Sequence, residues 1–168
     1  GLGIPYRTNE RRLDIREFGR MASALFADFC RSYGKELTMI LEPGRYLIAE
    51  AGTLLAMVTD RKRTPYRTFV GINSGFHHLI RPAMYGAYHP IMNASRVQGQ
   101  EEVVTVAGNL CEAGDVFAKD RKLTVCEEGD ILAILNAGAY GFSMSSNYNA
   151  RPKPAEVLVS GGQARVIR

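Results

Sequence analysis

The sequence contains only three cysteines, no dense cluster of basic residues, and no apolar run that approaches the length of a membrane helix. A membrane helix needs about 20 apolar residues, so we expect no membrane segment. The lysines and arginines are scattered, and their densest run, at 61–63, is too short to predict a nucleic-acid partner. Cys30, Cys111 and Cys126 are far apart and form no CxxC pair. This spacing argues against a metal site and favours a reduced, cytoplasmic protein.

Residues 1–6 have neither the basic region nor the apolar region of a signal peptide. The first residue is not methionine, and we therefore expect a piece of a longer chain. Of the 168 residues, 46% are hydrophobic and 23% are charged, with a net charge of +4. This composition is typical of a globular domain with a core of its own.

The first 45 residues differ in pattern from the rest. Apolar residues recur at spacings of three and four from about Leu13 to Tyr33, which predicts a helix that ends at Gly34. The apolar run from Leu37 to Leu41 follows, and it predicts a buried strand of an α/β unit. A complete (β/α)₈ barrel needs about 250 residues, so if this helix and strand belong to such a barrel, most of it is missing. If the rest of that barrel is missing, we expect an exposed apolar face around Phe18, Leu25 and Phe29.

From residue 46 onward, short apolar runs alternate with turn signals such as Gly129-Asp130 and Gly161-Gly162. Such a pattern predicts a β-sandwich or a Greek-key barrel, and the chain as a whole is expected to be mostly β. We divide it into 1–45 and 46–168, with a helical turn at 46–51. The expected strands are 53–59, 68–72, 91–95, 103–106, 123–125, 131–135, 155–159 and 164–167.

Two polar segments suggest groups that bind anions. Glu42-Pro43-Gly44-Arg45 follows the expected buried strand, where a glycine lets the backbone approach a phosphate and an arginine offers a rigid fork to an anion. The same four residues also fit a plain turn closed by a surface arginine. Arg81 and Tyr85 are spaced four apart and, on a local helix, can clamp a carboxylate together. A loop arginine beside a half-buried tyrosine explains that spacing equally simply.

Two further segments place reactive side chains among glycines. Cys111 and Glu112 lie in a loop between two β runs, where a thiol can donate a proton and a carboxylate can hold an ammonium group. A buried, inert cysteine is the alternative. Tyr140 lies between Gly138 and Gly141, where its phenol can donate to a phosphate or simply pack against the turn.

In combination these segments are far more specific than each one alone. The blocks EPGRYLIAEAG, LIRPAMYGAYH, CEAGD and GAYGFSMSSNYNARPKPAEVLV, with the opening GLGIPY and the ending GGQARVIR, resemble the diaminopimelate decarboxylases that depend on pyridoxal 5'-phosphate (PLP). The resemblance covers nearly the whole chain. It implies an N-terminal PLP-binding (β/α)₈ barrel, a C-terminal β domain, and a homodimer whose active sites lie at the interface. The implied reaction, part of lysine biosynthesis, removes carbon dioxide from meso-diaminopimelate and leaves L-lysine.

The resemblance also implies roles for single residues. Arg45, Arg81 and Tyr85 read the carboxylate at the non-reacting end of the substrate. Glu112 reaches in from the partner subunit and accepts the distal ammonium group, and Cys111 of the same loop supplies the proton after decarboxylation. The residues at the cofactor-binding positions are Gly1, Gly3, Glu42, Gly44, Arg45 and Tyr140.

The sequence departs from the family pattern in three places. The lysine that forms a Schiff base with PLP belongs to the N-terminal part of the barrel, so we expect this chain alone to bind PLP poorly and not to turn over. His77-His78 stands where the family usually has Asn-Asp or Asn-Ser, and Ala113 replaces a serine. The lysines outside the matching motif are Lys35, Lys62, Lys119, Lys122 and Lys153.

Two other interpretations remain open at this point. A related decarboxylase for ornithine, lysine or a siderophore intermediate would share most of these blocks. The retention of Arg81, Tyr85 and Glu112 favours a substrate with a distal carboxylate and amine, and hence diaminopimelate. A non-catalytic homologue that regulates an active subunit would lack the PLP lysine in its full-length sequence.

Overall fold

The computed structural model describes residues 2–168. Helix α1 (Ile15–Tyr33) begins at Asp14, whose side chain accepts hydrogen bonds from the N–H groups of Arg16 and Glu17, both at 3.0 Å. It ends at Gly34, whose φ of 76° is the left-handed conformation that glycine adopts without strain. The predicted helix and its C-cap are therefore confirmed.

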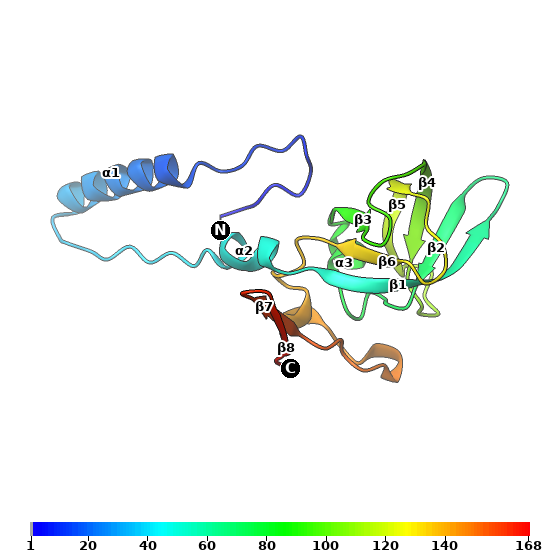
Figure 1. Ribbon diagram of the computed structural model, residues 1–168. Coiled ribbons are helices and arrows are strands. Elements are labelled where there is room, and N and C mark those ends of the chain that lie inside the picture. Colours follow the sequence, from blue (N-terminus) through cyan, green and yellow to red (C-terminus); the bar gives the residue numbers. More distant parts are fainter. Residues whose placement is uncertain (1) are drawn as a thin grey trace.

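Helix α1 extends away from the rest of the molecule (Figure 1). None of its residues is buried, and Leu25 and Phe29 are 67% and 52% exposed, whereas Phe18 is half-buried. An amphipathic helix is stabilised mainly by the surface against which its apolar face packs. The exposed stripe on α1 is the surface expected of a helix whose packing partner is not among the described residues.

The predicted strand from Leu37 to Leu41 is wrong for this chain. No residue of the segment pairs with any of the described residues in a sheet, and Leu37, Ile40 and Leu41 are all exposed. A strand needs a neighbour for its backbone hydrogen bonds, and β propensity alone does not provide one.

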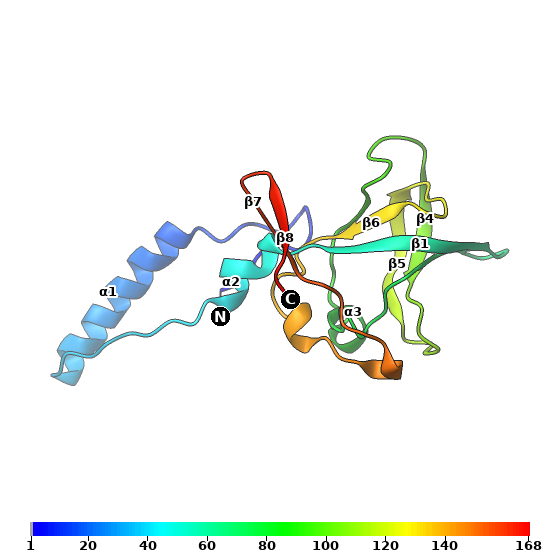
Figure 2. The same cartoon turned by 60° about the horizontal axis from the view of Figure 1, so that its bottom comes forward.

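The chain after residue 43 is mostly β (Figures 1 and 2). Helix α2 (Gly44–Ile48) and the 3₁₀ turn η1 (Ala49–Ala51) confirm the predicted helical turn, and the short helix α3 (Arg81–Tyr85) follows the second strand. The remaining turns are η2 (Phe142–Met144) and η3 (Tyr148–Ala150). The strands are β1 (Leu54–Arg63), β2 (Thr68–Ile72), β3 (Ile91–Asn93), β4 (Glu101–Ala107), β5 (Val116–Thr124), β6 (Ile131–Ile134), β7 (Val157–Ser160) and β8 (Gln163–Val166).

Six of these strands form one sheet in the order β3-β6-β1-β2-β4-β5, and β7 and β8 form a separate hairpin. Only the β2–β4 pair in the sheet is parallel. The two edge strands approach each other. The side-chain amide of Asn93 on β3 donates to the carbonyl of Val125, the residue after β5, at 3.4 Å. The sheet is therefore a nearly closed barrel, which decides between the two architectures that the sequence allowed. Each of the eight strands predicted after residue 46 is found, although β5 begins seven residues before the predicted Leu123.

The barrel interior is filled by the inward-facing apolar residues of these strands. Val58, Ile72, Val106 and Leu132 are each at most 1% exposed. Burying one such side chain contributes about 1.5–3 kcal/mol. The main core therefore lies within the barrel, and the polar segments singled out above lie on its connections.

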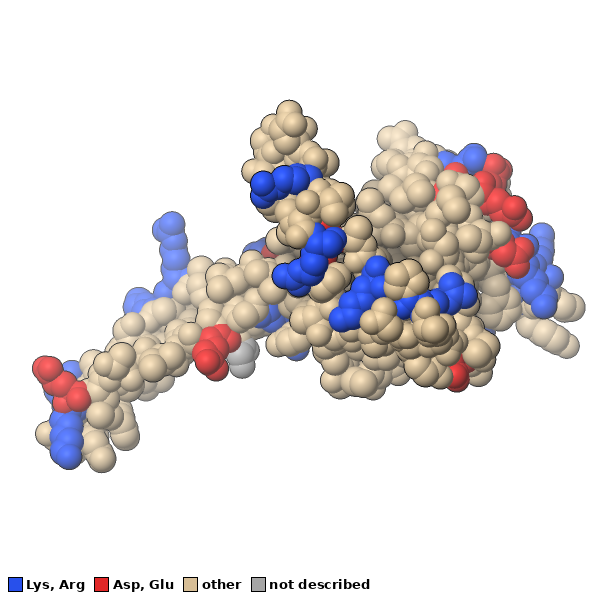
Figure 3. All heavy atoms as spheres, turned by 90° about the horizontal axis from the view of Figure 1, so that it is seen from below, with Lys and Arg blue, Asp and Glu red and all other residues tan. Residues whose placement is uncertain are grey.

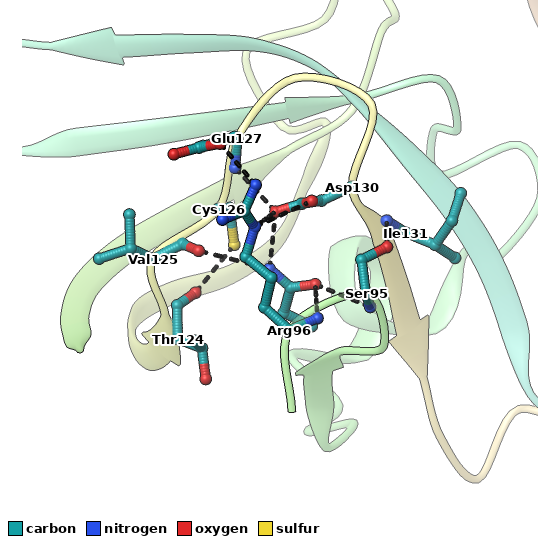
Figure 4. A network of polar contacts seen from close by, with 9 residues as sticks. Ser95, Arg96, Thr124, Val125, Cys126, Glu127, Asp130 and Ile131 are labelled. Carbon is teal, nitrogen blue, oxygen red and sulfur yellow. Dashed lines mark hydrogen bonds and ion pairs between the residues drawn. The ribbon is translucent and has the colours of Figure 1, made fainter. Parts of the chain in front are cut away.

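A polar network closes the barrel near the edge strands (Figure 4). The carboxylate of Asp130 accepts hydrogen bonds from Asn93 at 2.9 Å, from the Arg96 guanidinium at 3.0 Å and from the N–H of Glu127 at 2.9 Å. Burial opposes ionisation of this carboxyl, but these donors outweigh it and lower the pKa of Asp130. Among residues 2–168, no helix is both long enough and apolar enough to cross a membrane.

Candidate active site

Three segments that are far apart in the sequence meet around one small cavity of about 160 Å³. Of the residues predicted to bind the cofactor, Glu42, Gly44, Arg45 and Tyr140 line it, and Gly3 follows the lining residue Leu2. Gly1 lies outside the described residues. The other lining residues are Leu2 and Pro43.

Close backbone contacts bring Tyr140 to this cavity. The N–H of Gly138 donates to the carbonyl of Ala49 at 3.0 Å, and a Cβ at position 138 would lie 1.9 Å from the carbonyl oxygen of Ile48. Only glycine allows this approach of the loop to α2 and η1. Tyr140 itself has a φ of 66°, which a residue with a side chain seldom adopts and which turns its ring toward Arg45.

Arg45 offers an unused donor at the same place. Its Nε is buried and has no hydrogen-bond partner within the described part of the chain, and its guanidinium lies 5.6 Å from the centre of the Tyr140 ring. A buried donor without a partner is costly, and an anion in the cavity would satisfy it. The residues present therefore fit a phosphate or carboxylate group.

Arg81 also lies near the Tyr140 ring, with its guanidinium 5.8 Å from the ring centre. It is 7% exposed, and its Nη1 donates to the hydroxyl of Tyr6 and to Nε2 of His89, both at 3.1 Å. Its partners are neutral, and no carboxylate pairs with it among residues 2–168. A buried cation without a counter-charge is unfavourable, and an anionic ligand would compensate it.

His89 is held in one protonation state. Its Nδ1 lies 2.9 Å from the carbonyl oxygen of Leu135 and must carry the proton, which leaves Nε2 free to accept from Arg81. Burial lowers the pKa of His89, and the charges of Arg81 and Arg121 lower it further, against the hydrogen bond to Leu135. His89 is therefore a neutral acceptor for Arg81.

Tyr85 shares α3 with Arg81 but not its burial. The tyrosine side chain is 62% exposed, whereas the arginine is almost fully enclosed. The predicted local helix is found, and it ends at Gly86 with a φ of 60°. The expectation that Arg81 and Tyr85 act on one carboxylate stays a prediction.

Cys111 and Glu112 lie in an exposed loop between β4 and β5, and the buried Asp115 at the end of this loop fixes its position. The buried Asp115 carboxylate accepts the N–H of Leu110 at 2.8 Å and the N–H of Phe76 at 2.7 Å. Burial raises the pKa of Asp115 although both hydrogen bonds oppose the shift. The Cys111–Glu112 loop is thus fixed to the segment after β2. Neither residue lines the cavity beside Arg45.

A larger cavity, of about 620 Å³, lies between α3, the loop after Glu112 and β5. Arg7, Lys119 and Arg121 line it, and none of the predicted site residues does. Basic atoms also form a band across the middle of the face seen in Figure 3, with acidic atoms mainly toward its two ends. Size alone does not make that cavity the reactive centre, because the candidate reactive groups lie elsewhere.

One protein family matches most of the chain. Residues 28–138 match the C-terminal sheet domain of the pyridoxal-dependent decarboxylase family. The chain belongs to this family. The match begins inside α1 and extends to the loop before Tyr140.

Individual relatives of this chain carry a more specific name. It is 53% identical over 170 residues to the diaminopimelate decarboxylase of Methanothermobacter thermautotrophicus, and the match covers 100% of this chain and 40% of the relative. A crystal structure of the diaminopimelate decarboxylase from Methanocaldococcus jannaschii superposes with a TM-score of 0.93 at 43% identity, over 100% of this chain and 38% of that one. A second structure of the M. jannaschii enzyme, in co-complex with L-lysine, gives a TM-score of 0.89 at 45% identity with the same coverage. The chain thus spans about 40% of the length of these relatives.

Sequence reasoning missed several residues that shape the candidate site. Tyr6, His89 and Asp115 were not singled out for their contacts, although all three lie in or beside family blocks. The hydroxyl of Tyr148 donates to Glu112, and the side-chain amide of Asn149 lies 3.4 Å from Sγ of Cys111. In the sequence, only the family block that contains SSNYNARP points to these contacts, because Asn149 and Cys111 are 38 residues apart in the chain.

The His77-His78 pair lies in the segment after β2, to which the Cys111–Glu112 loop is fixed through Asp115. His77 is 2% exposed, and neither of its ring nitrogens has a partner among the residues described. His78 is better satisfied, with Nδ1 2.9 Å from Ser74 Oγ and Nε2 3.0 Å from the carbonyl of Pro152. Within residues 2–168 no cluster of ligating side chains suitable for a metal ion is found, and the pair is not part of one.

Proposed function

We propose that this chain is the C-terminal part of a diaminopimelate decarboxylase, which removes carbon dioxide from the D-centre of meso-diaminopimelate and leaves L-lysine. The observation that carries the proposal is the pair of guanidiniums, of Arg45 and Arg81, that lie 5.6 and 5.8 Å from the centre of the Tyr140 ring. Arg45 has an unpartnered buried Nε, and Arg81 is buried among neutral groups. Both require an anion. A substrate with a distal carboxylate supplies one anion, and the phosphate of the cofactor supplies the other.

The family membership implies pyridoxal phosphate, and the cavity beside Arg45 is where we propose that its phosphate binds. The group supplies an electron sink for the bond that breaks when carbon dioxide leaves. The chain's own contribution is to bind and orient, with Tyr140 donating its phenol to the phosphate. The lysine that carries the cofactor is proposed to lie in the N-terminal part of the longer protein. The proposed phosphate-binding residues are Gly1, Gly3, Glu42, Gly44, Arg45 and Tyr140.

The substrate is proposed to be held by its non-reacting end. Arg45, Arg81 and Tyr85 bind the distal carboxylate, and holding it selects which of two similar ends reacts. Glu112 accepts the distal ammonium group, and Cys111 delivers a proton to the carbon that has lost carbon dioxide.

Glu112 and Cys111 are proposed to serve the neighbouring subunit of a homodimer. Their exposure and their separation from the Arg45 cavity support this assignment, since a loop that serves a neighbour must project from its own domain. We also propose that residues 1–45 belong to the cofactor-binding barrel, that 46–168 form the β domain, and that the enzyme is cytoplasmic.

The test uses the full-length protein that contains this chain. We expect equimolar L-lysine and carbon dioxide from meso-diaminopimelate, and little turnover of ornithine or lysine. Glu112→Ala should lose this turnover, whereas Glu128→Ala, an exposed glutamate outside the site, should keep it. Preferential turnover of ornithine or lysine would overturn the substrate. Full activity of Glu112→Ala would overturn the role of that carboxylate.

A further inference from the structure

The loop that carries Cys111 and Glu112 is contacted from one side by the turn η3. The side-chain amide of Asn149 donates a hydrogen bond to Sγ of Cys111 at 3.4 Å. The hydroxyl of Tyr148 donates to Oε1 of Glu112. Two consecutive residues of η3 thus contact the two residues to which the chemistry is assigned. Tyr148 contacts Glu112, and Asn149 contacts Cys111.

The backbone of η3 is strained where it makes these contacts. Asn149 has φ 57° and ψ 28°, and Ala150 has φ 56°, so two successive residues with side chains adopt the left-handed conformation. Alanine is disfavoured there because its Cβ crowds the following carbonyl. Such strain persists only where the surroundings impose it, and it is concentrated at functional sites.

Both flanks of η3 are anchored to the segments that hold the reactive loop. The N–H of Ser146 donates to the carbonyl of His77 at 2.8 Å, before the turn. After the turn, Nη2 of Arg151 donates to the carbonyl of Asn109 at 3.2 Å, two residues ahead of Cys111. The strained turn is therefore held against the loop from both directions.

The Tyr148 ring adds a third anchor, since it stacks on Phe76 with ring centres 5.4 Å apart. The N–H of Phe76 donates to the Asp115 carboxylate, which also fixes the reactive loop through Leu110. The hydrogen bond to Glu112 raises the pKa of the Tyr148 phenol, so this hydroxyl remains a donor at neutral pH.

The two contacts have different chemical consequences. An amide N–H directed at sulfur orients the Cys111 side chain for proton transfer. A phenol directed at a carboxylate fixes the carboxylate without neutralising it, so Glu112 keeps its charge for an ammonium group.

We infer that Tyr148 and Asn149 are positioning residues for the decarboxylase reaction, Asn149 for proton delivery by Cys111 and Tyr148 for recognition of the substrate ammonium by Glu112. The inference rests on the proposed function for the roles of Cys111 and Glu112. It goes beyond that proposal by assigning the two roles to separate members of one turn, each of which can be altered by itself.

The first experiment measures Cys111 without substrate. The full-length protein is alkylated at a series of pH values, and modification of the peptide that contains Cys111 is followed by mass spectrometry. Asn149→Gly keeps the left-handed backbone accessible and removes the amide. We expect its alkylation profile to differ from the wild-type profile by a change in rate of about threefold or more, because the hydrogen bond that orients Sγ is lost. Cys126 does not interfere, because burial raises its pKa to about 11 and its peptide is resolved separately.

The second experiment measures the substrate. Tyr148→Phe keeps the stacking on Phe76 and removes only the hydroxyl. We expect KM for diaminopimelate to rise about tenfold, because an oriented hydrogen bond to a charged group is lost, while kcat changes less. The alkylation profile of Cys111 should be unchanged in Tyr148→Phe.

Asn147→Gly is the matched control, since Asn147 lies in the same segment but bonds only the carbonyl of Arg151, at 2.8 Å. It should change neither measurement. The inference fails if Asn149→Gly leaves the alkylation profile at the wild-type position, or if all three variants shift both measurements together, as a merely structural turn would. A protein that turns over a different diamino acid would refute the proposed function, while the alkylation result would still decide the role of Asn149.

Discussion

Nη1 of Arg81 donates to Nε2 of His89 at 3.1 Å, and no acidic side chain pairs with this arginine within residues 2–168. A neutral imidazole orients the guanidinium but leaves its charge available. The domain therefore keeps a cation buried at a cost in stability, and a bound anion would recover that cost.

This arrangement predicts that stability and activity separate in Arg81→Met. The free energy of unfolding should stay within about 2 kcal/mol of the wild type, because the lost hydrogen bonds are offset by relief of the buried charge. In the full-length enzyme kcat/KM should fall about 100-fold or more, because a charge-assisted contact to the substrate carboxylate is lost. Urea unfolding and steady-state kinetics measure the two effects. Arg61→Met, which removes a surface pair with Glu102, is the control and should keep full activity. Retention of activity in Arg81→Met would contradict the anion-binding role.

Gly108→Ala should disrupt the base of the Cys111–Glu112 loop. A Cβ at position 108 would lie 2.1 Å from Oδ2 of Asp115, so the buried carboxylate would have to move and release its N–H donors. We expect a loss of about 2 kcal/mol or more in unfolding free energy. Gly114→Ala is the matched control, since a Cβ there meets nothing within 4 Å, and it should change stability by less than about 0.5 kcal/mol. Thermal unfolding of both variants distinguishes a steric clash from a general sensitivity of the loop.

The two buried carboxyl groups should respond to pH in opposite directions. The pKa of Asp130 is lowered in the folded protein, so its contribution is present above the ordinary value of 3.8 and is lost as pH falls through the lowered folded value. The pKa of Asp115 is raised, so the folded state favours its protonated form, and stability is lost as pH rises from 3.8 through the raised value. Urea unfolding between pH 3 and pH 6 (roughly one unit below and two units above the ordinary value) should show this in Asp130→Asn and Asp115→Asn. The wild-type advantage over the first should grow with pH, and that over the second should shrink. Parallel curves for both variants would rule out opposite shifts.

His77→Leu should change the pH dependence of stability. Burial, with the nearby charges of His78 and Arg151, lowers the pKa of His77 from 6.5 to about 4. The folded state therefore excludes the protonated form, and wild-type stability should fall as pH drops from 6.5 toward 4. His77→Leu removes this dependence and two buried nitrogens without partners, and at pH 4 its relative gain should reach about 3 kcal/mol. Equal slopes for variant and wild type across this interval would show that His77 is not the group that titrates.

The sequence by itself determined the local elements of this protein. Helix α1 follows from its apolar spacing and from the glycine that ends it, since both depend on neighbours within a few residues. The strands of the barrel follow from short β-rich runs between turn signals, and the family blocks contain the polar residues to which we assign the chemistry.

What only the tertiary structure decided depends on contacts between distant residues. The closure of the sheet into a barrel depends on how β3 meets β5, and the failure of the Leu37–Leu41 strand depends on a missing neighbour. Backbone pairing is not encoded within a run, because the hydrogen-bond partners lie elsewhere. The same holds for the site. The Cys111–Glu112 pair was visible in the sequence, whereas the contact of Cys111 with Asn149 exists only because the fold brings a strained turn to the loop.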